Sequence, residues 1–377
     1  MTYKKTLCFS ANTSWYLYNF RYSVLKSLKN DGYRIICIAP FDVYSQKLID
    51  ELNVEWEDLS INRKSLNPIR EIKTILKLHS IYKKNSPDIC INFTIKNNIY
   101  GTIAAKINNC SVINNITGLG TAFYKRNILY YIASLLYKKI LNHSSFIFCQ
   151  NKHDQLFIKQ KFNICSEKII LTPGSGVNLK KFKKNHNKER SDSFNFLFVG
   201  RLIRDKGINE LISAFELIDK KKYNCHLYIA GNIDKENRTA ISIEQLDNWK
   251  KKSNITWLGA INDMPALYNM CDCIVLPSYS EGLPRTLIEA GAMGLPAIAS
   301  DIPGCKDIIS NGMNGYLCDA RNTHDLYSKM LIILNSTTEH LNILSQNALL
   351  NVINNFNEDI VVEKTKFAIN KIITFRD

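Results

Sequence analysis

Short apolar stretches alternate with amphipathic stretches along the whole chain, and this alternation predicts an α/β architecture with parallel sheets. The apolar stretches of the second half contain few polar residues, which is typical of strands buried on both faces of a doubly wound sheet. Strands are predicted in the first half at Thr6–Ala11, Tyr33–Pro40, Asp88–Phe93, Cys110–Thr117, Ser145–Gln150 and Ile169–Val177. In the second half they are predicted at Phe194–Gly200, Cys225–Gly231, Asn254–Gly259, Cys273–Ser278 and Leu295–Ser300, with helices over about 20–30 and 208–218.

One polar segment, Lys180–Ser193, interrupts the alternation and is charged and without apolar periodicity, as expected of a linker. The 377 residues are enough for two domains with cores of their own. We therefore expect one domain over 1–185, a second over 186–357, and a final segment, 358–377, whose helix crosses back to the first domain. Two such domains in tandem favour a ligand in a central cleft between them.

The composition, 45% hydrophobic and 22% charged, is that of an ordinary globular protein. No apolar run approaches the roughly 20 residues that cross a bilayer, and the amino terminus has no signal-peptide core, so we expect a cytoplasmic protein. The 11 cysteines are scattered and form no C-x-x-C motif. This pattern favours reduced thiols and argues against a disulfide framework or a zinc site.

Positive charge is concentrated in the first half of the chain. Residues 1–190 carry 30 Lys and Arg against 12 Asp and Glu, whereas the remainder carries 19 against 22. This imbalance suggests an anionic partner, either nucleic acid, an anionic membrane or a phosphorylated lipid, and the alternative is a solvated basic face. Within this half, the segment Phe123–Leu141 contains an apolar stretch that is flanked by Lys125, Arg126, Lys138 and Lys139. It predicts either an interfacial helix on anionic lipid or an amphipathic helix packed on the sheet.

The candidate chemistry is densest between Ser280 and Pro296. Gly282, Leu283 and Pro284 form a turn at which a helix can begin with its first amides available to an anion. Glu281 precedes the turn, and Glu289 lies about six residues beyond Leu283, or roughly 9 Å along the predicted helix axis. The spacing fits a ligand with a phosphate at one end and a hydroxylated ring further along, which predicts a nucleotide-sugar site.

Two cations follow the strand that ends at Gly200. Arg201 can form a forked contact with phosphate oxygens, and Lys206 adds a second charge, although single surface cations are common in loops. The chain has no G-x-x-x-x-G-K-[ST] motif, no G-x-G-x-x-G after a strand and no D-x-D triplet. A leaving diphosphate would therefore be stabilised by these cations and by helix amides, and we expect no metal and no other cofactor.

Polar residues also follow strands of the first half. Asn12, Thr13 and Ser14 follow the first strand, and Lys96 and Thr117 follow two later ones. Such side chains can bind a sugar or a phosphate, and the alternative for each is local stabilisation of its loop.

These motifs together resemble the retaining glycosyltransferases of family 4, which have the GT-B fold of two facing Rossmann-like domains. The matching segments are Gly200–Gly207, the E-x7-E element from Glu281 to Glu289, and Asp301–Leu317. Pro173–Asn178 matches the element that ends the first domain, with Asn178 where the family usually has aspartate.

The resemblance implies a role for each matching residue. Arg201 and Lys206 would hold the donor diphosphate with the amides around Gly282–Pro284, and Glu289 would bind the ribose hydroxyls. Glu281 would be the catalytic residue, lying near the transferred sugar and steadying positive charge on it. Retention of the anomeric configuration and independence from metal are implied as well.

The first half resembles a narrower branch that acts on undecaprenyl-diphosphate-linked sugars in O-antigen, capsule and related glycan assembly. The matches are Ala11–Arg21, Asn92–Gly101 and Asn114–Phe123. The branch implies transfer of N-acetylgalactosamine or another N-acetylhexosamine from a UDP donor, at the inner face of the cytoplasmic membrane. Thr117 stands where many members have a histidine, which leaves the sugar contact of that histidine without a counterpart.

Three other functions remain open at this point. The same fold occurs in nucleotide-sugar epimerases and phosphorylases, and a GT-B chain can also be a catalytically silent partner subunit. The basic first half by itself also fits a nucleic-acid binder, but the chain contains no recognised nucleic-acid module. We expect no nucleic-acid partner.

Overall fold

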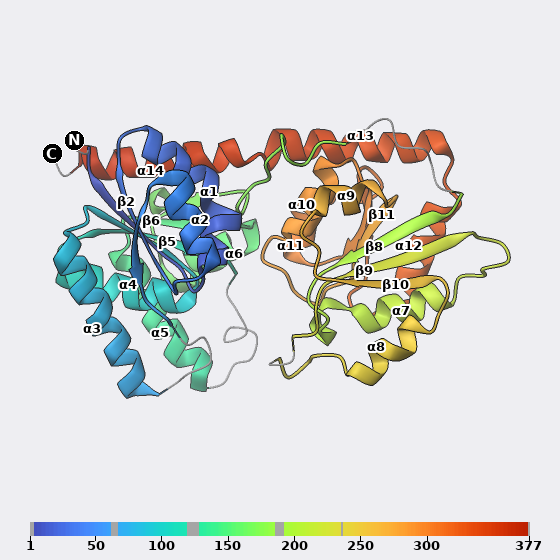
Figure 1. Cartoon of the computed structure of the whole chain (residues 1–377), viewed down its shortest axis with the longest axis horizontal. Helices are drawn as coiled ribbons and strands as arrows, with labels where there is room; N and C mark the ends of the chain where they lie inside the picture. Colours follow the sequence, from blue (N-terminus) through green and yellow to red (C-terminus); the bar gives the residue numbers. More distant parts are fainter. Residues whose placement is uncertain (1–3, 62–66, 119–127, 185–191, 235–236, 376–377) are drawn as a thin grey trace. The chain divides into compact units, whose positions relative to one another are not determined.

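The strands pair, all in parallel, into one sheet of seven strands and one of six (Figure 1). The computed structural model describes the chain except for residues 1–3, 62–66, 119–127, 185–191, 235–236 and 376–377. The first unit consists of Met1–Ser175 and Glu358–Asp377, and the second of Gly176–Asn357. Both sheets are doubly wound, as the alternation of the sequence predicts.

The sheet of the first unit has the strand order β3-β2-β1-β4-β5-β6-β7. Its strands are β1 (Thr6–Ser10), β2 (Arg34–Ala39), β3 (Glu55–Asp58), β4 (Ile89–Phe93), β5 (Ser111–Ile116), β6 (Phe146–Cys149) and β7 (Ile169–Leu171). Its helices are α1 (Ser14–Asn30), α2 (Val43–Leu52), α3 (Pro68–Asn85), α4 (Ile95–Ile107), α5 (Ile128–His143), α6 (Lys152–Phe162), the short 3-10 turn η2 (Ser166–Lys168) and α14 (Glu358–Thr374).

Side chains of alternating strand positions enter separate cores on the two faces of this sheet. Leu7 and Phe9 pack with α1 and α14 on one face, whereas Cys8 packs with α3 and α4 on the other. Val361, Ala368 and Ile369 of α14 are buried in the first of these cores. The segment after residue 357 is therefore part of the first unit's core.

The sheet of the second unit has the strand order β10-β9-β8-β11-β12-β13. Its strands are β8 (Phe194–Val199), β9 (Cys225–Ala230), β10 (Ile255–Gly259), β11 (Cys273–Leu276), β12 (Ala297–Ser300) and β13 (Gly315–Cys318). Its helices are η3 (Arg204–Lys206), α7 (Ile208–Glu216), α8 (Ile243–Lys250), α9 (Met264–Asn269), α10 (Arg285–Ala292), α11 (Pro303–Lys306), α12 (Thr323–Leu334) and α13 (Thr338–Asn355).

The division between the units lies earlier than the predicted boundary at 185. It falls after Ser175, because Val177 and Phe182 are buried in the core of the second unit. Val177 also forms a bridge with Asn357 within that unit. Residues 185–191 of the predicted linker lie outside the described residues, and Lys180–Lys184 belong to the second unit.

Candidate functional site

Three loops meet at the carboxyl edge of the second sheet, after the neighbouring strands β8, β11 and β12. The loop after β8 carries Lys206, the loop after β11 carries Glu281, and the loop after β12 carries Gly304. In parallel sheets, loops at this edge are the usual positions of ligand contacts. The structure therefore gathers most of the predicted donor residues at one edge of one sheet.

Glycines hold these loops close together. Gly207 has φ +69°, and a Cβ there would lie 2.0 Å from the carbonyl oxygen of Pro277. A Cβ on Gly304 would lie 2.4 Å from the carbonyl oxygen of Gly282. Because only glycine avoids both overlaps, these two positions determine how closely the loops approach.

Tyr279 ties the loop after β8 to the loop after β11. Its amide donates to the carbonyl oxygen of Asp205 at 2.9 Å, and its hydroxyl donates to Glu210 of α7 at 2.6 Å. Burial and the neighbouring Glu210 carboxylate raise the pKa of Tyr279 to about 12. The hydroxyl therefore remains a hydrogen-bond donor near neutral pH and holds the loop after β11 against the amino end of α7.

Lys206 and Glu281 form an ion pair across the two tied loops, from Nζ to Oε1. Their side chains are only 21% and 11% exposed. A pair this sheltered is poorly screened, and removing one partner leaves a desolvated charge at a cost of about 3–5 kcal/mol. The cation predicted for the diphosphate and the carboxylate predicted for the sugar are thus already in contact.

Glu289 lies on α10 with both of its carboxylate oxygens bound. Arg285 Nε donates to Oε1 at 2.8 Å, and the Tyr268 hydroxyl donates to Oε2 at 3.0 Å. Pro284 is the N-cap of α10, and no side chain caps the helix. As the sequence predicts, Glu281 is followed by the turn Gly282–Pro284 and then by the helix that carries Glu289.

Arg201 is placed differently from Lys206. It pairs with Asp234, in the loop after β9, at 2.7 Å, and its side chain is 61% exposed. An exposed pair of this kind is worth about 0–1 kcal/mol, so Arg201 can exchange its partner for a phosphate at little cost. Within the described residues, no ion pair joins Arg201 to Glu281 or Glu289.

In the first unit, the residues after β1 make one local contact and two contacts with other elements. Asn12 Oδ1 accepts from Asn97 Nδ2 at 2.6 Å. Thr13 caps α1 by accepting from the Tyr16 amide at 3.2 Å, and the Ser14 hydroxyl donates to Asp42. Only the Thr13 contact is the local stabilisation that the sequence leaves open as the alternative role, because Asn97 and Asp42 lie 85 and 28 positions away along the chain.

Lys96 lies in the first turn of α4, where it pairs with Glu71 of α3 at 2.8 Å. The residue before this helix, Thr94, has φ +77°. A β-branched side chain rarely adopts this conformation, and such strain tends to occur at functional sites. Thr117 follows β5 and is half-buried.

Sequence reasoning missed several residues that hold the site together. Asn97 is fully buried and bonds both Ser10 and Asn12, and Tyr268 is fully buried against Glu289. Asn97 lies within the Asn92–Gly101 motif, so its position was available as a signal. No sequence signal pointed to Tyr268 or Asp234, because their hydrogen-bond partners lie 21 and 33 positions away along the chain.

The cysteines are free thiols, and no disulfide forms among them. Burial, and to a lesser degree the charge of Glu281, raises the pKa of the Cys305 thiol well above its usual value. Among the described residues, no three His, Cys, Asp or Glu side chains cluster as a metal site would require. Nor does that part of the chain include a helix of the length and apolarity needed to cross a bilayer.

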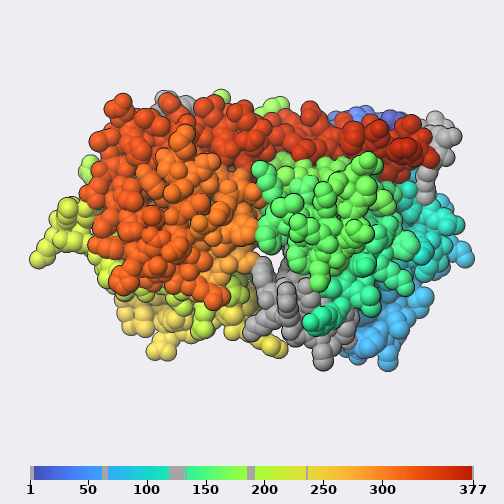
Figure 2. All heavy atoms as spheres, turned by 180° about the vertical axis from the view of Figure 1, so that it is seen from behind, coloured from blue at the N-terminus to red at the C-terminus, as the bar shows by residue number. Residues whose placement is uncertain are grey.

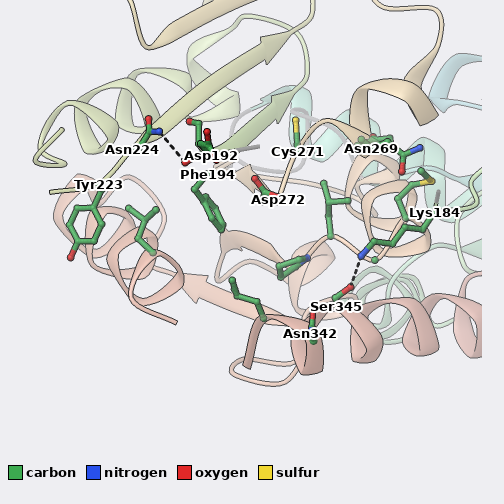
Figure 3. Close-up of a pocket in the computed structure, with 18 of the residues that line it drawn as sticks. Lys184, Asp192, Phe194, Tyr223, Asn224, Asn269, Cys271, Asp272, Asn342 and Ser345 are labelled. Atoms are coloured by element: carbon green, nitrogen blue, oxygen red, sulfur yellow. Dashed lines mark hydrogen bonds between the residues drawn. The ribbon is translucent and has the colours of Figure 1, made fainter. Parts of the chain in front are cut away.

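A cavity of about 550 Å³ lies at the opposite, amino edge of the second sheet (Figure 3). Phe194, Asn224 and Asp272, which precede or begin strands, contribute to its wall. Figure 3 shows Lys184 directed toward Ser345, to which it donates at 3.3 Å. None of the predicted site residues lines this cavity.

Two family models match the chain, one in each half. The model described as "Glycosyl transferase 4-like" matches residues 6–151, and "Glycosyl transferases group 1" matches residues 180–350. The second range contains Arg201, Lys206, Glu281 and Glu289.

Curated relatives match over most of their length. The chain is 28% identical to the N,N'-diacetylbacillosaminyl-diphospho-undecaprenol alpha-1,3-N-acetylgalactosaminyltransferase of Campylobacter jejuni, over 92% of this chain and 94% of the relative. It is 26% identical to the UDP-Gal:alpha-D-GlcNAc-diphosphoundecaprenol alpha-1,3-galactosyltransferase of Escherichia coli, over 80% of each chain.

Among solved structures, Anabaena Alr3699/HepE in complex with UDP and glucose superimposes with a TM-score of 0.81. The match covers 97% of this chain and 100% of the other at 16% identity. At that identity the likeness shows a shared fold.

Proposed function

Because the chain belongs to the family 4 glycosyltransferases of the GT-B fold, we propose that it transfers a sugar from a UDP donor to an undecaprenyl-diphosphate-linked saccharide. The sugar is N-acetylgalactosamine or another N-acetylhexosamine, and the product enters O-antigen, capsule or related glycan assembly. The names of the Campylobacter and Escherichia relatives support this acceptor class, and the UDP complex of the Anabaena structure supports the donor.

The observation that carries the proposal is the contact between Lys206 and Glu281 at the carboxyl edge of the second sheet. A cation and a carboxylate are held side by side, next to the uncapped amino end of α10. This arrangement suits a ligand whose diphosphate meets the cation and the helix while its sugar meets the carboxylate.

In the proposed reaction, the acceptor hydroxyl forms a bond to the anomeric carbon of the donor sugar as the bond from that carbon to the diphosphate oxygen breaks. Lys206 and Arg201 stabilise the charge that develops on the departing diphosphate. The leaving phosphate oxygen takes the proton of the acceptor hydroxyl on the same face of the sugar. The configuration is thus retained, and neither a separate base nor a metal is needed.

We also propose that the first unit rests on the anionic inner leaflet, where the lipid-linked acceptor resides. Ile69, Ile72 and Leu76 recur on one side of α3 and are exposed, and Lys73 and Lys77 lie between and beside them. On α5, Tyr131 and Leu135 are exposed in the same way, with Lys138 and Lys139 one turn further on.

The positions of these two helices support the membrane proposal. Helices α3 and α5 follow strands β3 and β5, so both begin at the carboxyl edge of the first sheet. Figures 1 and 2 show the beginnings of both at the same end of this unit. Exposed apolar residues flanked by lysines are the pattern of an interfacial contact with anionic lipid. Residues 123–127 of the segment predicted to be interfacial lie outside the described residues.

The proposed function is tested by incubating the protein with a panel of UDP-sugars and a synthetic undecaprenyl-diphosphate N-acetylhexosamine, with products identified by mass spectrometry. We expect one UDP-N-acetylhexosamine to extend the acceptor by one residue, with an α linkage by NMR and an unchanged rate in EDTA. Conversion of a UDP-sugar without acceptor would instead indicate an epimerase. A β linkage would refute retention, and loss of activity in EDTA would refute metal independence.

A further inference from the structure

Glu289 is held by two donors of different origin. Arg285 precedes it by one helical turn on α10, is 21% exposed, and binds Oε1. Tyr268 comes from α9, on the other side of strand β11 in the sequence, is fully buried, and binds Oε2 at 3.0 Å. One donor is thus local and partly in solvent, whereas the other is part of the core.

The surroundings of Tyr268 keep its hydroxyl in one place. Helix α9 is started by Asp263, whose side chain accepts from the Ala266 amide at 3.1 Å. The tyrosine ring lies 6.2 Å from the ring of Phe182. Burial, reinforced by the charge of Glu289, raises the pKa of Tyr268 well above its usual value. The hydroxyl is therefore protonated, and acts as a donor, throughout the working pH range.

A carboxylate whose two oxygens are each bound cannot rotate freely about its last side-chain bond. Each oxygen of Glu289 still has capacity for a further hydrogen bond, because a carboxylate offers about four acceptor sites in total. Two hydroxyls on adjacent ring carbons match such a fixed pair of acceptors. Arg285 lies in the first turn of α10, beside the expected diphosphate, so a bound UDP-sugar can draw it away from Glu289. The hydrogen bond from Tyr268 to Glu289 does not depend on the UDP-sugar in this way.

We propose that Tyr268 is the positioning residue that orients Glu289 for the two hydroxyls of a ribose, and so makes the site select ribonucleotides. This inference rests on the proposed function, since it requires that a nucleotide binds beside α10. Tyr268 itself does not touch the nucleotide in this proposal. It acts through the direction in which the Glu289 lone pairs point.

The test compares two competitive inhibitors, UDP and 2′,3′-dideoxy-UDP, on the whole protein and on Tyr268→Phe. The variant removes one buried hydroxyl and leaves the ring in place. We expect the inhibition constant for UDP to rise about tenfold, as for a lost hydrogen bond to a charged group. The constant for the dideoxy nucleotide, which has no hydroxyls for Glu289, should change less than about twofold, and the KM of the UDP-sugar should rise with kcat nearly unchanged.

Tyr316→Phe is the matched control, because it too removes a hydrogen-bonded hydroxyl, one that contacts His340 at 2.9 Å elsewhere in the same unit. It should leave both inhibition constants unchanged. If Tyr268→Phe weakened both nucleotides equally, Tyr268 would have a merely structural role, and if it weakened neither, the proposal would be wrong. Failure of the unmodified protein to bind UDP would instead refute the proposed function.

Discussion

Lys206 and Glu281 neutralise each other's charge, and this contact changes what each substitution is expected to do. In the proposed reaction, a diphosphate arriving at Lys206 competes with Glu281 for the same ammonium group. When the diphosphate takes that group, the Glu281 carboxylate is released to face the sugar. The ion pair would thus hold both charges at a poorly solvated position until the diphosphate of the UDP-sugar replaces Glu281 as the partner of Lys206.

Replacing Glu281 should therefore separate binding from chemistry. We expect Glu281→Ala to lower the rate of transfer by more than about 10²-fold, because charge stabilisation at the sugar is lost. The affinity for UDP should stay the same or increase, since Lys206 no longer has a competing partner. Initial rates and calorimetric titration with UDP measure the two effects, and near wild-type turnover would refute the role of Glu281.

Lys206 should be needed for both binding and leaving-group stabilisation. Lys206→Ala is expected to lower kcat/KM by about 10²-fold, with a weaker affinity for UDP. The control is Arg204→Ala, an exposed cation of the same 3-10 turn, which should change kcat/KM less than about twofold. If the two substitutions lowered kcat/KM equally, activity would depend on the total positive charge of the turn and not on the position of Lys206.

At the residue scale, the sequence predicts where Lys206, Glu281 and Glu289 lie in the fold, because strand ends and helix starts determine their positions. It does not predict which acid pairs with which base. Arg201 binds Asp234, and Lys96 binds Glu71. These pairings depend on loops and helices that the fold brings together, and no local pattern records them.

Helix α4 shows how a tertiary network can override local preference. Asn98 donates to the backbone of Asn115 at 2.9 Å, and Asn114 donates to Thr102 at 2.8 Å, all within the buried interface of α4 with the sheet. Asparagine is a poor residue for helices and strands by intrinsic propensity. Here the side-chain amides bind a backbone carbonyl and a threonine hydroxyl, and they fix the helix whose first turn carries Lys96.

At the element scale, the strands predicted from apolar runs are found with shifted ends, and two of the four described edge strands, β3 and β13, were not predicted. Strand β3 reads Glu-Trp-Glu-Asp and is half exposed, so it has no apolar signal. Strand β13 is only 4 residues long. Helix α1 begins at Ser14, earlier than the apolar periodicity predicts, because Thr13 caps it.

The exposed face of α3 gives a prediction at the same scale. Leu76→Asp should lower binding to vesicles of anionic lipid by about tenfold, because it replaces a side chain proposed to insert with a charge that the lipid repels. Leu350→Asp on α13 is the control, since Leu350 is 54% exposed and Leu76 is 58% exposed. Vesicle co-sedimentation measures both variants, and an equal loss for the two would argue against α3 as the contact.

At the scale of the whole molecule, the basic excess of residues 1–190 predicts how membrane binding depends on salt. Binding to vesicles with anionic lipid should weaken steeply between low salt and about 0.5 M salt, because the attraction is screened over distances near 10 Å or less. Vesicles of neutral lipid should bind poorly at every salt concentration. Tight binding to duplex DNA with equal salt dependence would instead revive the nucleic-acid alternative.

The chain enters the second unit after Ser175 and leaves it after Asn357, so this unit is an insertion within the first. The consequence concerns how such enzymes can be recombined. A chimera that joins the front half of one family member to the back half of another would separate β1–β7 from α14, whose Val361 and Ile369 complete their core. Exchanging 176–357 as a cassette, with both termini left native, keeps each core intact. With the donor bound by the second unit, as proposed, donor preference would be transferred by replacing this internal segment.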